Sequence, residues 1–170
     1  MSTALEADFN AQITLELESA VVYRQLAIEM DMRDLRGMAT WLRRQAEEEN
    51  RHAEKFIDHL TDRGNHAVIG TIPSPSVSVS SVLECFETAR AHEERVSTAI
   101  RSLYRQSEAT DDLDSRPLLT WFLTEQLEEE AKVDEIVGRV GMIAGDGPGL
   151  LRLDAEMSAR STGSADTDAR

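Results

Sequence analysis

The placement of glycine and proline divides this chain into two helical halves. Residues 5–32 are rich in Ala, Leu, Glu and Gln and contain neither glycine nor proline, which predicts a helix whose start Ser2 or Thr3 can cap. A second helical run covers residues 34–62 and ends near Gly64, a residue that suits a left-handed C-terminal cap. The first half is therefore a predicted pair of long helices.

The segment between the two halves is unlike either of them. Residues 65–79 contain Gly70, Pro73 and Pro75 together with serines and β-branched residues, which predicts an extended connection long enough to cross a bundle. Helix-forming sequence resumes over residues 80–107. After an acidic turn a fourth helix runs to about residue 141, and after a glycine-rich break a short fifth helix is predicted over residues 150–160.

The predicted order is two long helical hairpins joined by one long crossover. This connectivity distinguishes ferritin-like bundles from simple up-down-up-down bundles. We therefore predict an all-α, ferritin-like four-helix bundle with a long crossover between the second and third helices and a short fifth C-terminal helix. Residues 1–160 form the predicted single domain, and residues 161–170, a tail of small and polar residues, are expected to be disordered.

The amino-acid composition limits the partners that this chain can bind. The 170 residues include 32 acidic and 18 basic side chains, giving a net charge of -14, so the chain should repel nucleic acid and anionic membranes and attract cations. Cys85 is the only cysteine, which excludes an intrachain disulfide and favours a reducing compartment. Because no leader pattern and no run of about 20 apolar residues is found, we expect a cytoplasmic protein without a membrane partner.

Each predicted helix carries apolar residues at alternating spacings of three and four, the pattern of a core-facing stripe. A carboxylate interrupts every stripe near its middle. The four glutamates, one per helix, are Glu16, Glu49, Glu93 and Glu129. The second stripe also carries Gln45 and, one turn beyond its glutamate, His52, whereas the fourth also carries Gln126.

Four buried carboxylates require compensation. Each would cost several kcal/mol unless paired, and no lysine or arginine shares these stripes. Two divalent metal ions would supply four positive charges and balance the site. Carboxylate oxygen and imidazole nitrogen are ligands that iron, manganese and zinc all accept, so ligand type alone does not choose among these metals.

At these positions the sequence resembles bacterial ferritins, and the resemblance covers nearly the whole chain. The segments that carry it are Leu15-Glu16-Leu17, Trp41-Leu42-Arg43-Arg44, Glu48-Glu49-Asn50-Arg51-His52, His92-Glu93 and the block from Trp121 to Glu130. The resemblance implies an iron-storage subunit that assembles into a hollow homo-oligomeric cage of roughly 24 copies.

The resemblance also assigns ligands for iron. Glu16, Glu49 and His52 would hold one ion. The second ion would be held by Glu49, Glu93 and Glu129, so that Glu49 bridges the pair. The remaining assignments are Gln126 as a hydrogen-bonding or weak ligand, and a third site made by Glu48, Glu125 and Glu128, which shares Glu129.

Two departures from related di-iron bundles predict that the chain binds no haem. The fourth helix carries Gln126 and Glu129 where many ferritin-like bundles have a second Glu-x-x-His motif. Asn50 follows the bridging glutamate where haem-binding relatives have a methionine. These features favour a non-haem ferritin.

The predicted activity is that of a ferroxidase. Two Fe(II) ions would give up electrons to O2 or H2O2, the ferric product would be stored as mineral inside the cage, and Tyr23 and Trp121 are candidate electron donors. One alternative is a structural or buffering metal-binding bundle without efficient oxidation. A small-cage DNA-protecting relative is disfavoured, because its ligands would lie between subunits. His59, His66 and His92 have no carboxylate at ligand spacing and are predicted to be surface or loop residues.

Overall fold

The computed structural model describes residues 1–163 apart from 76, 78 and 144, with side chains described up to residue 159. Within these residues the regular secondary structure consists of five α-helices and one 3-10 turn, without any strand. The elements are α1 (Thr3–Asp31), α2 (Arg36–Asp62), α3 (Val82–Ala109), the 3-10 turn η1 (Leu113–Ser115), α4 (Arg116–Met142) and α5 (Gly147–Gly163). The predicted all-α class is confirmed.

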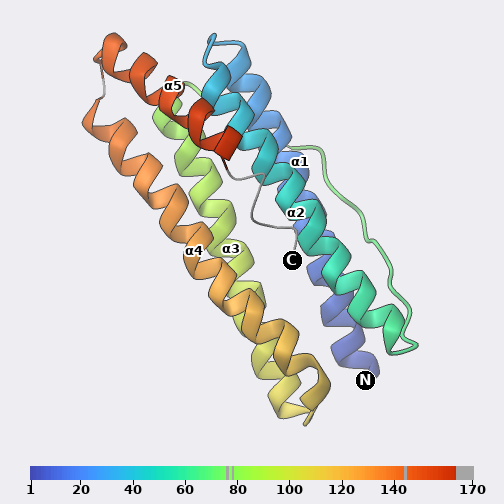
Figure 1. Ribbon diagram of the computed structural model, residues 1–170. Coiled ribbons are helices and arrows are strands. Elements are labelled where there is room, and N and C mark those ends of the chain that lie inside the picture. Colours follow the sequence, from blue (N-terminus) through green and yellow to red (C-terminus); the bar gives the residue numbers. More distant parts are fainter. Residues whose placement is uncertain (76, 78, 144, 164–170) are drawn as a thin grey trace.

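The helices form two antiparallel hairpins, α1 with α2 and α3 with α4, packed side by side (Figure 1). The crossover runs along the outside of the first hairpin, so that α2 and α3 point the same way (Figure 1). Side chains of α1 hold the crossover in place. Asn10 Oδ1 accepts the Val68 N–H at 2.8 Å, and Thr14 Oγ1 accepts the Gly70 N–H at 2.8 Å.

Local chemistry sets the helix ends. The Ser2 hydroxyl caps α1 by accepting the Leu5 N–H, and the Ser81 hydroxyl caps α3 by accepting the Glu84 N–H. Gly64 follows α2 with a φ of +71°, the left-handed conformation that its sequence position predicts. Asp34 also has a positive φ, of 58°, which turns the chain between α1 and α2 and delays the start of α2 to Arg36.

The fifth helix is longer than the sequence suggests. It begins at Gly147 instead of residue 150, because Pro148 stands in its first turn, where the absent N–H has no helical acceptor to lose. It also continues to Gly163, three residues into the predicted tail, and residues 164–170 of that tail lie outside the described part. Helix α5 crosses the end of the bundle beside the start of α2 (Figure 1).

The core consists of two apolar clusters with a polar layer between them. One cluster lies at the α5 end and includes Leu26, Met30, Leu42, Phe86 and Val133. The other lies at the opposite end and includes Phe9, Ile13, Phe56, Ile100 and Phe122. In sequence, each helix passes from one cluster to the other through its interrupting glutamate, so the four carboxylates share one level of the bundle.

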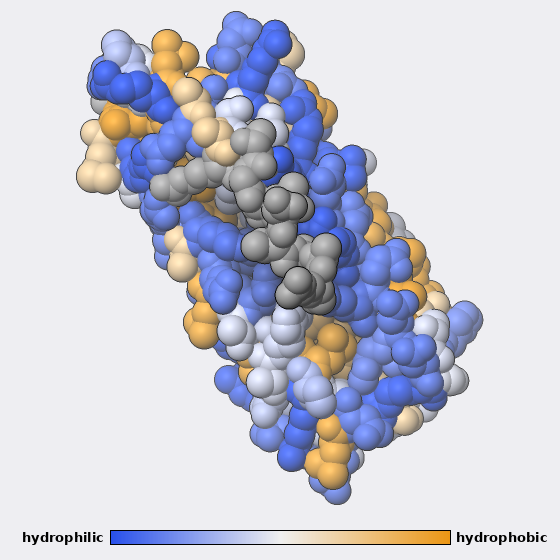
Figure 2. Space-filling view, in the orientation of Figure 1, coloured by the Kyte–Doolittle hydropathy of each residue, from blue (hydrophilic) through white to orange (hydrophobic). Residues whose placement is uncertain are grey.

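The outer surface is mainly hydrophilic on the face drawn in Figure 2, with small apolar patches between charged side chains. None of the described helices combines the length and the apolar character that crossing a membrane requires. Among the carboxylates whose side chains are described, the four interrupting glutamates are buried and the others are half-buried or exposed.

Candidate metal centre

Six polar side chains from all four bundle helices meet in the layer between the core clusters. They are Glu16 from α1, Glu49 and His52 from α2, Glu93 from α3, and Gln126 and Glu129 from α4. Their exposed fractions lie between 0% and 2%. The sequence stripes therefore predicted the burial of every one of these residues correctly.

Three of these residues form an open set of ligands. Oxygens of Glu16 and Glu49 and a ring nitrogen of His52 lie within 4.8 Å of one another. Oε2 of Glu16, both oxygens of Glu49 and Nδ1 of His52 are buried and have no hydrogen-bond partner, although Nδ1 of His52 lies 3.5 Å from Oε2 of Glu49. Buried polar atoms are almost always hydrogen-bonded, so this concentration of potential ligand atoms without a hydrogen bond suits a cation.

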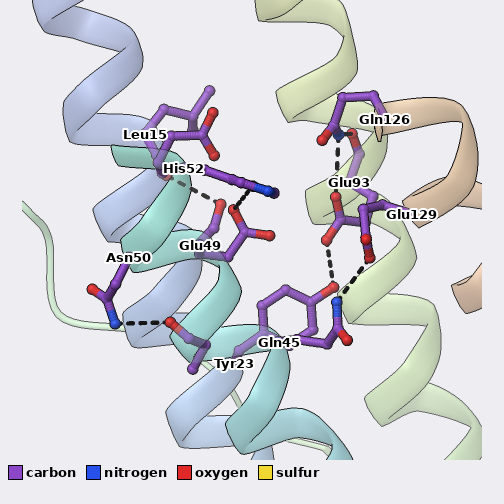
Figure 3. A network of polar contacts seen from close by, with 12 residues as sticks. Leu15, Tyr23, Gln45, Glu49, Asn50, His52, Glu93, Gln126 and Glu129 are labelled. Atoms are coloured by element: carbon purple, nitrogen blue, oxygen red, sulfur yellow. Dashed lines mark hydrogen bonds and ion pairs between the residues drawn. The ribbon is translucent and has the colours of Figure 1, made fainter. Parts of the chain in front are cut away.

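Glu93 is arranged differently, because both of its oxygens already accept hydrogen bonds. The Tyr23 hydroxyl donates to one oxygen, and Nε2 of Gln126 donates to the other at 3.2 Å (Figure 3). Gln126 also reaches Ser97 Oγ at 3.3 Å, while its own Oε1 is buried and unpaired. A metal ion on this side would have to share or replace these donors.

Glu129 is also held at both oxygens. Nε2 of Gln45 donates to its Oε2 at 2.8 Å (Figure 3), and Nζ of Lys132 lies 2.6 Å from its Oε1. The absence of lysine and arginine from the apolar stripes predicted uncompensated carboxylates, and for Glu129 this was wrong. Lys132 follows Glu129 by three residues, one helical turn, and its long side chain reaches the carboxylate from beside the stripe.

Burial raises the pKa of all four glutamates. The pKa values of Glu16 and Glu49 lie well above the ordinary range, first because of desolvation and then because of the neighbouring carboxylates. Burial raises the pKa of Glu93 to about 7 and also raises that of Glu129. Four charges at this level repel one another, and bound cations would relieve that repulsion.

The residues predicted for a third site come together only in part. Glu48 and Glu125 are half-buried, and each has an oxygen within 4.8 Å of a ring nitrogen of His52 and of the other's carboxylate. Glu128 is exposed and is not part of this group. The group that could hold a cation between α2 and α4 thus contains His52 and lacks the predicted Glu128.

The two predicted electron donors both lie beside the centre. Tyr23 is buried, and its ring meets that of Trp41 edge to face with centroids 6.4 Å apart. Trp121 is 39% exposed, and its ring centroid lies 5.7 Å from that of His52. One aromatic side chain thus connects the centre to the core, and the other connects it to the surface.

The other histidines were predicted to be surface or loop residues: His66 is exposed in the crossover, whereas His59 and His92 are half-buried on α2 and α3. His59 stacks on Phe9 with ring centroids 5.2 Å apart. His92 is half-buried, its Nδ1 lies 3.1 Å from Ser19 Oγ, and burial lowers its pKa to about 4. Neither is part of the metal centre: His59 lies two turns beyond His52 along α2, next to Phe9 and Ser115, and His92 contacts Ser19.

Comparisons with known proteins agree with this arrangement. Residues 6–143 match the Ferritin family, described as a ferritin-like domain. The chain is 33% identical over 153 residues to a bacterial non-heme ferritin of Escherichia coli O6:H1, covering 90% of this chain and 93% of the relative. It is 34% identical over 161 residues to one of Staphylococcus epidermidis, covering 95% and 97%. Among solved structures, an open pore ferritin from Archaeoglobus fulgidus matches with a TM-score of 0.91 and 33% identity, covering 93% of this chain and 98% of that one.

Proposed function

Because this chain belongs to the ferritin family, we propose that it stores iron and oxidises Fe(II) at the metal centre inside its bundle. The observation that carries the proposal is the group of buried ligand atoms without a hydrogen bond on Glu16, Glu49 and His52. These atoms offer oxygen and nitrogen to a cation in the middle of an otherwise apolar core. Iron accepts this ligand set.

In the proposed reaction the two iron ions are substrates. Glu16, Glu49 and His52 hold the first ion, and Glu93 and Glu129 hold the second, with Glu49 between them. Each Fe(II) loses one electron, and O2 takes up both electrons and two protons to give H2O2. Bridging carboxylates can keep such ions about 3.5–4 Å apart, which allows both electrons to leave together.

The proposal has three further parts. Tyr23 and Trp121 lie where they could supply additional electrons. Glu48 and Glu125, with His52 or Glu128, would hold a third ion between α2 and α4. The similarity to ferritins supports assembly of roughly 24 subunits into a cytoplasmic, haem-free cage that holds the ferric mineral.

The test is Fe(II) oxidation under air, followed by stopped-flow absorbance in Glu49→Ala, His52→Ala and the control Glu47→Ala. Glu47 is exposed on the outer side of α2. We expect each centre variant to slow the initial oxidation at least about tenfold, as loss of a metal ligand or its support commonly does, and Glu47→Ala to leave it unchanged. Wild-type rates in both centre variants would overturn the proposal.

The oxygens of Glu93 and Glu129 already accept hydrogen bonds, from Tyr23 and Lys132 among others. This favours one alternative, a bundle that buffers metal ions without efficient oxidation. Such a bundle would bind the first ion at the open ligands and fill the second position poorly. Adding Fe(II) stepwise separates the two functions. A fast ferric signal that saturates at two ions per subunit supports the ferroxidase, whereas slow oxidation only at high loading supports buffering.

A further inference from the structure

Lys132 has an unusual position for a cationic side chain. Its Nζ lies 2.6 Å from Oε1 of Glu129, a residue with 0% exposure, while 44% of the Lys132 side chain remains exposed. The lysine thus reaches from the surface of α4 into the polar layer. It brings a positive charge to Oε1 of a glutamate that is a predicted metal ligand.

Other acidic residues around Lys132 strengthen this arrangement. The negative charges of Glu129, Glu48 and Glu125 all attract the ammonium group. Glu48 and Glu125 also belong to the second group of potential ligands, with His52. The ammonium therefore stands among the same carboxylates that would attract an additional cation.

The two sides of the centre differ accordingly. Glu16 and Glu49 have three buried oxygens without a hydrogen-bond partner, whereas both oxygens of Glu129 are engaged, one by Lys132 and one by Gln45. Of the described lysines and arginines, Lys132 is the one that forms an ion pair with a glutamate of the centre. On the side of Glu16 and Glu49 a cation would meet three oxygens without a hydrogen-bond donor, whereas at Glu129 it would meet oxygens that already have donors.

We propose that Lys132 is an internal counter-ion that competes with metal ions for Glu129. Without metal, its charge compensates a buried carboxylate and stabilises the bundle. With metal, the ammonium must leave Oε1 of Glu129 and turn to solvent, so it weakens binding of the ion that uses this oxygen. The proposal rests on the function proposed above, and it makes Lys132 a residue that sets metal affinity without being a ligand.

This competition distinguishes the proposed role from an ordinary stabilising ion pair. Removing an ordinary ion pair lowers stability with and without metal. Removing a competitor lowers the stability of the metal-free protein but strengthens metal binding, since Glu129 is then free. The two effects of one substitution therefore have opposite signs.

The experiment is a titration of the full chain with Zn²⁺, which binds the same donor types without redox chemistry, monitored by competition with a chelating dye. Wild type is compared with Lys132→Met, Lys132→Arg and Arg105→Met. Met keeps the length of the side chain without its charge, and Arg keeps the charge. Arg105→Met makes the same change in net charge at an exposed position of α3, about 18 Å along the helix from Glu93.

We expect Lys132→Met to bind the Glu129-dependent ion at least about tenfold more tightly, the range of a charged hydrogen bond. Its metal-free form should unfold at a lower temperature than wild type, and saturating Zn²⁺ should raise its unfolding temperature by more than it raises that of wild type. Lys132→Arg and Arg105→Met should bind Zn²⁺ as wild type does. If Lys132→Met does not fold, Lys132→Gln provides the same comparison with a neutral donor.

The outcomes separate the two proposals. If wild type binds two Zn²⁺ per subunit and the neutral Lys132 variants bind them with unchanged affinity, the competitor role is wrong and the metal centre stands. If wild type binds no Zn²⁺ that depends on Glu49 and His52, the metal centre itself is wrong. If Arg105→Met strengthens binding as much as Lys132→Met does, the effect is one of net charge and the competitor role is again overturned.

Discussion

Oδ1 of Asp154 in α5 accepts the backbone N–H of Met38 in α2 at 2.8 Å. The first residues of α2 have no capping side chain of their own, because the N-cap position is Leu35. A side chain from the far end of the chain therefore satisfies one of the free N–H groups at the start of α2. Helix α5 is in this way part of the stability of the bundle.

The first prediction concerns this cap. Asp154→Ala should lower the free energy of unfolding by about 1 kcal/mol, the usual value of an N-cap side chain. Asp154→Asn should lose much less, because its amide oxygen can still accept the Met38 N–H. Urea unfolding followed by circular dichroism measures both. Equal stability of Asp154→Ala and wild type would show that this hydrogen bond contributes nothing to the free energy of unfolding.

The second prediction concerns Gly37, which lies under α5. A Cβ added at Gly37 would lie 1.9 Å from the backbone oxygen of Asp154, so Gly37→Ala must push α5 away. We expect a loss of about 1–3 kcal/mol, typical of overpacking. Gly138→Ala is the matched control, because its Cβ would meet nothing within 4 Å, and alanine in a helix stabilises by roughly 0.5–1 kcal/mol over glycine. Thermal unfolding should therefore move in opposite directions in the two variants.

The sequence predicted the ligand layer well because helical periodicity is a local property. A spacing of three and four fixes which side of a helix faces the core, so Glu16, Glu49, Glu93 and Glu129 could be placed inside without knowing how the helices pack. The crossover could be placed as well, since its prolines and glycine exclude a helix.

Partners from other parts of the fold could not be predicted in the same way. The sequence around Asp154 does not indicate that its side chain accepts the Met38 N–H, because this contact depends on how α5 lies across the bundle. Gly37 gave a weak signal, a glycine inside a helical run that costs about 1 kcal/mol relative to alanine. Lys132 was overlooked because it lies beside the stripe, and only the length of its side chain brings it to Glu129.

The third prediction concerns pH. The pKa of Glu93 in the folded protein is raised to about 7, and the pKa values of Glu16 and Glu49 are also raised. At pH values between the unfolded and the folded pKa of these groups, the folded chain therefore holds more protons than the unfolded chain. The stability that these three groups contribute is fully present below their unfolded pKa and is lost as the pH rises through the folded pKa. The metal-free protein should therefore be less stable at about pH 8 than at about pH 6, because the buried Glu93 carboxyl loses its proton between these two values.

Two comparisons check the origin of this pH dependence. Glu93→Gln removes one titrating group and keeps the shape of the side chain, so the loss of stability between the two pH values should be smaller than in wild type. Saturating Zn²⁺ should reduce the loss further, because bound cations favour the charged carboxylates. A pH dependence that neither change alters would place its cause outside the centre.

The last prediction concerns Tyr23 and its hydrogen bond to Glu93. Tyr23→Phe removes the donor from a buried acceptor, which costs about 1–3 kcal/mol in the metal-free protein. A metal ion on Glu93 can satisfy the same oxygen, so Zn²⁺ should recover most of this stability. Phe is the closest match in shape, and Tyr104→Phe, at a half-buried tyrosine far along α3, is the control that should show neither effect. Differential scanning calorimetry with and without Zn²⁺ measures the stability of each variant. A loss of stability in Tyr23→Phe that persists at saturating Zn²⁺ would mean that Tyr23 contributes only through packing.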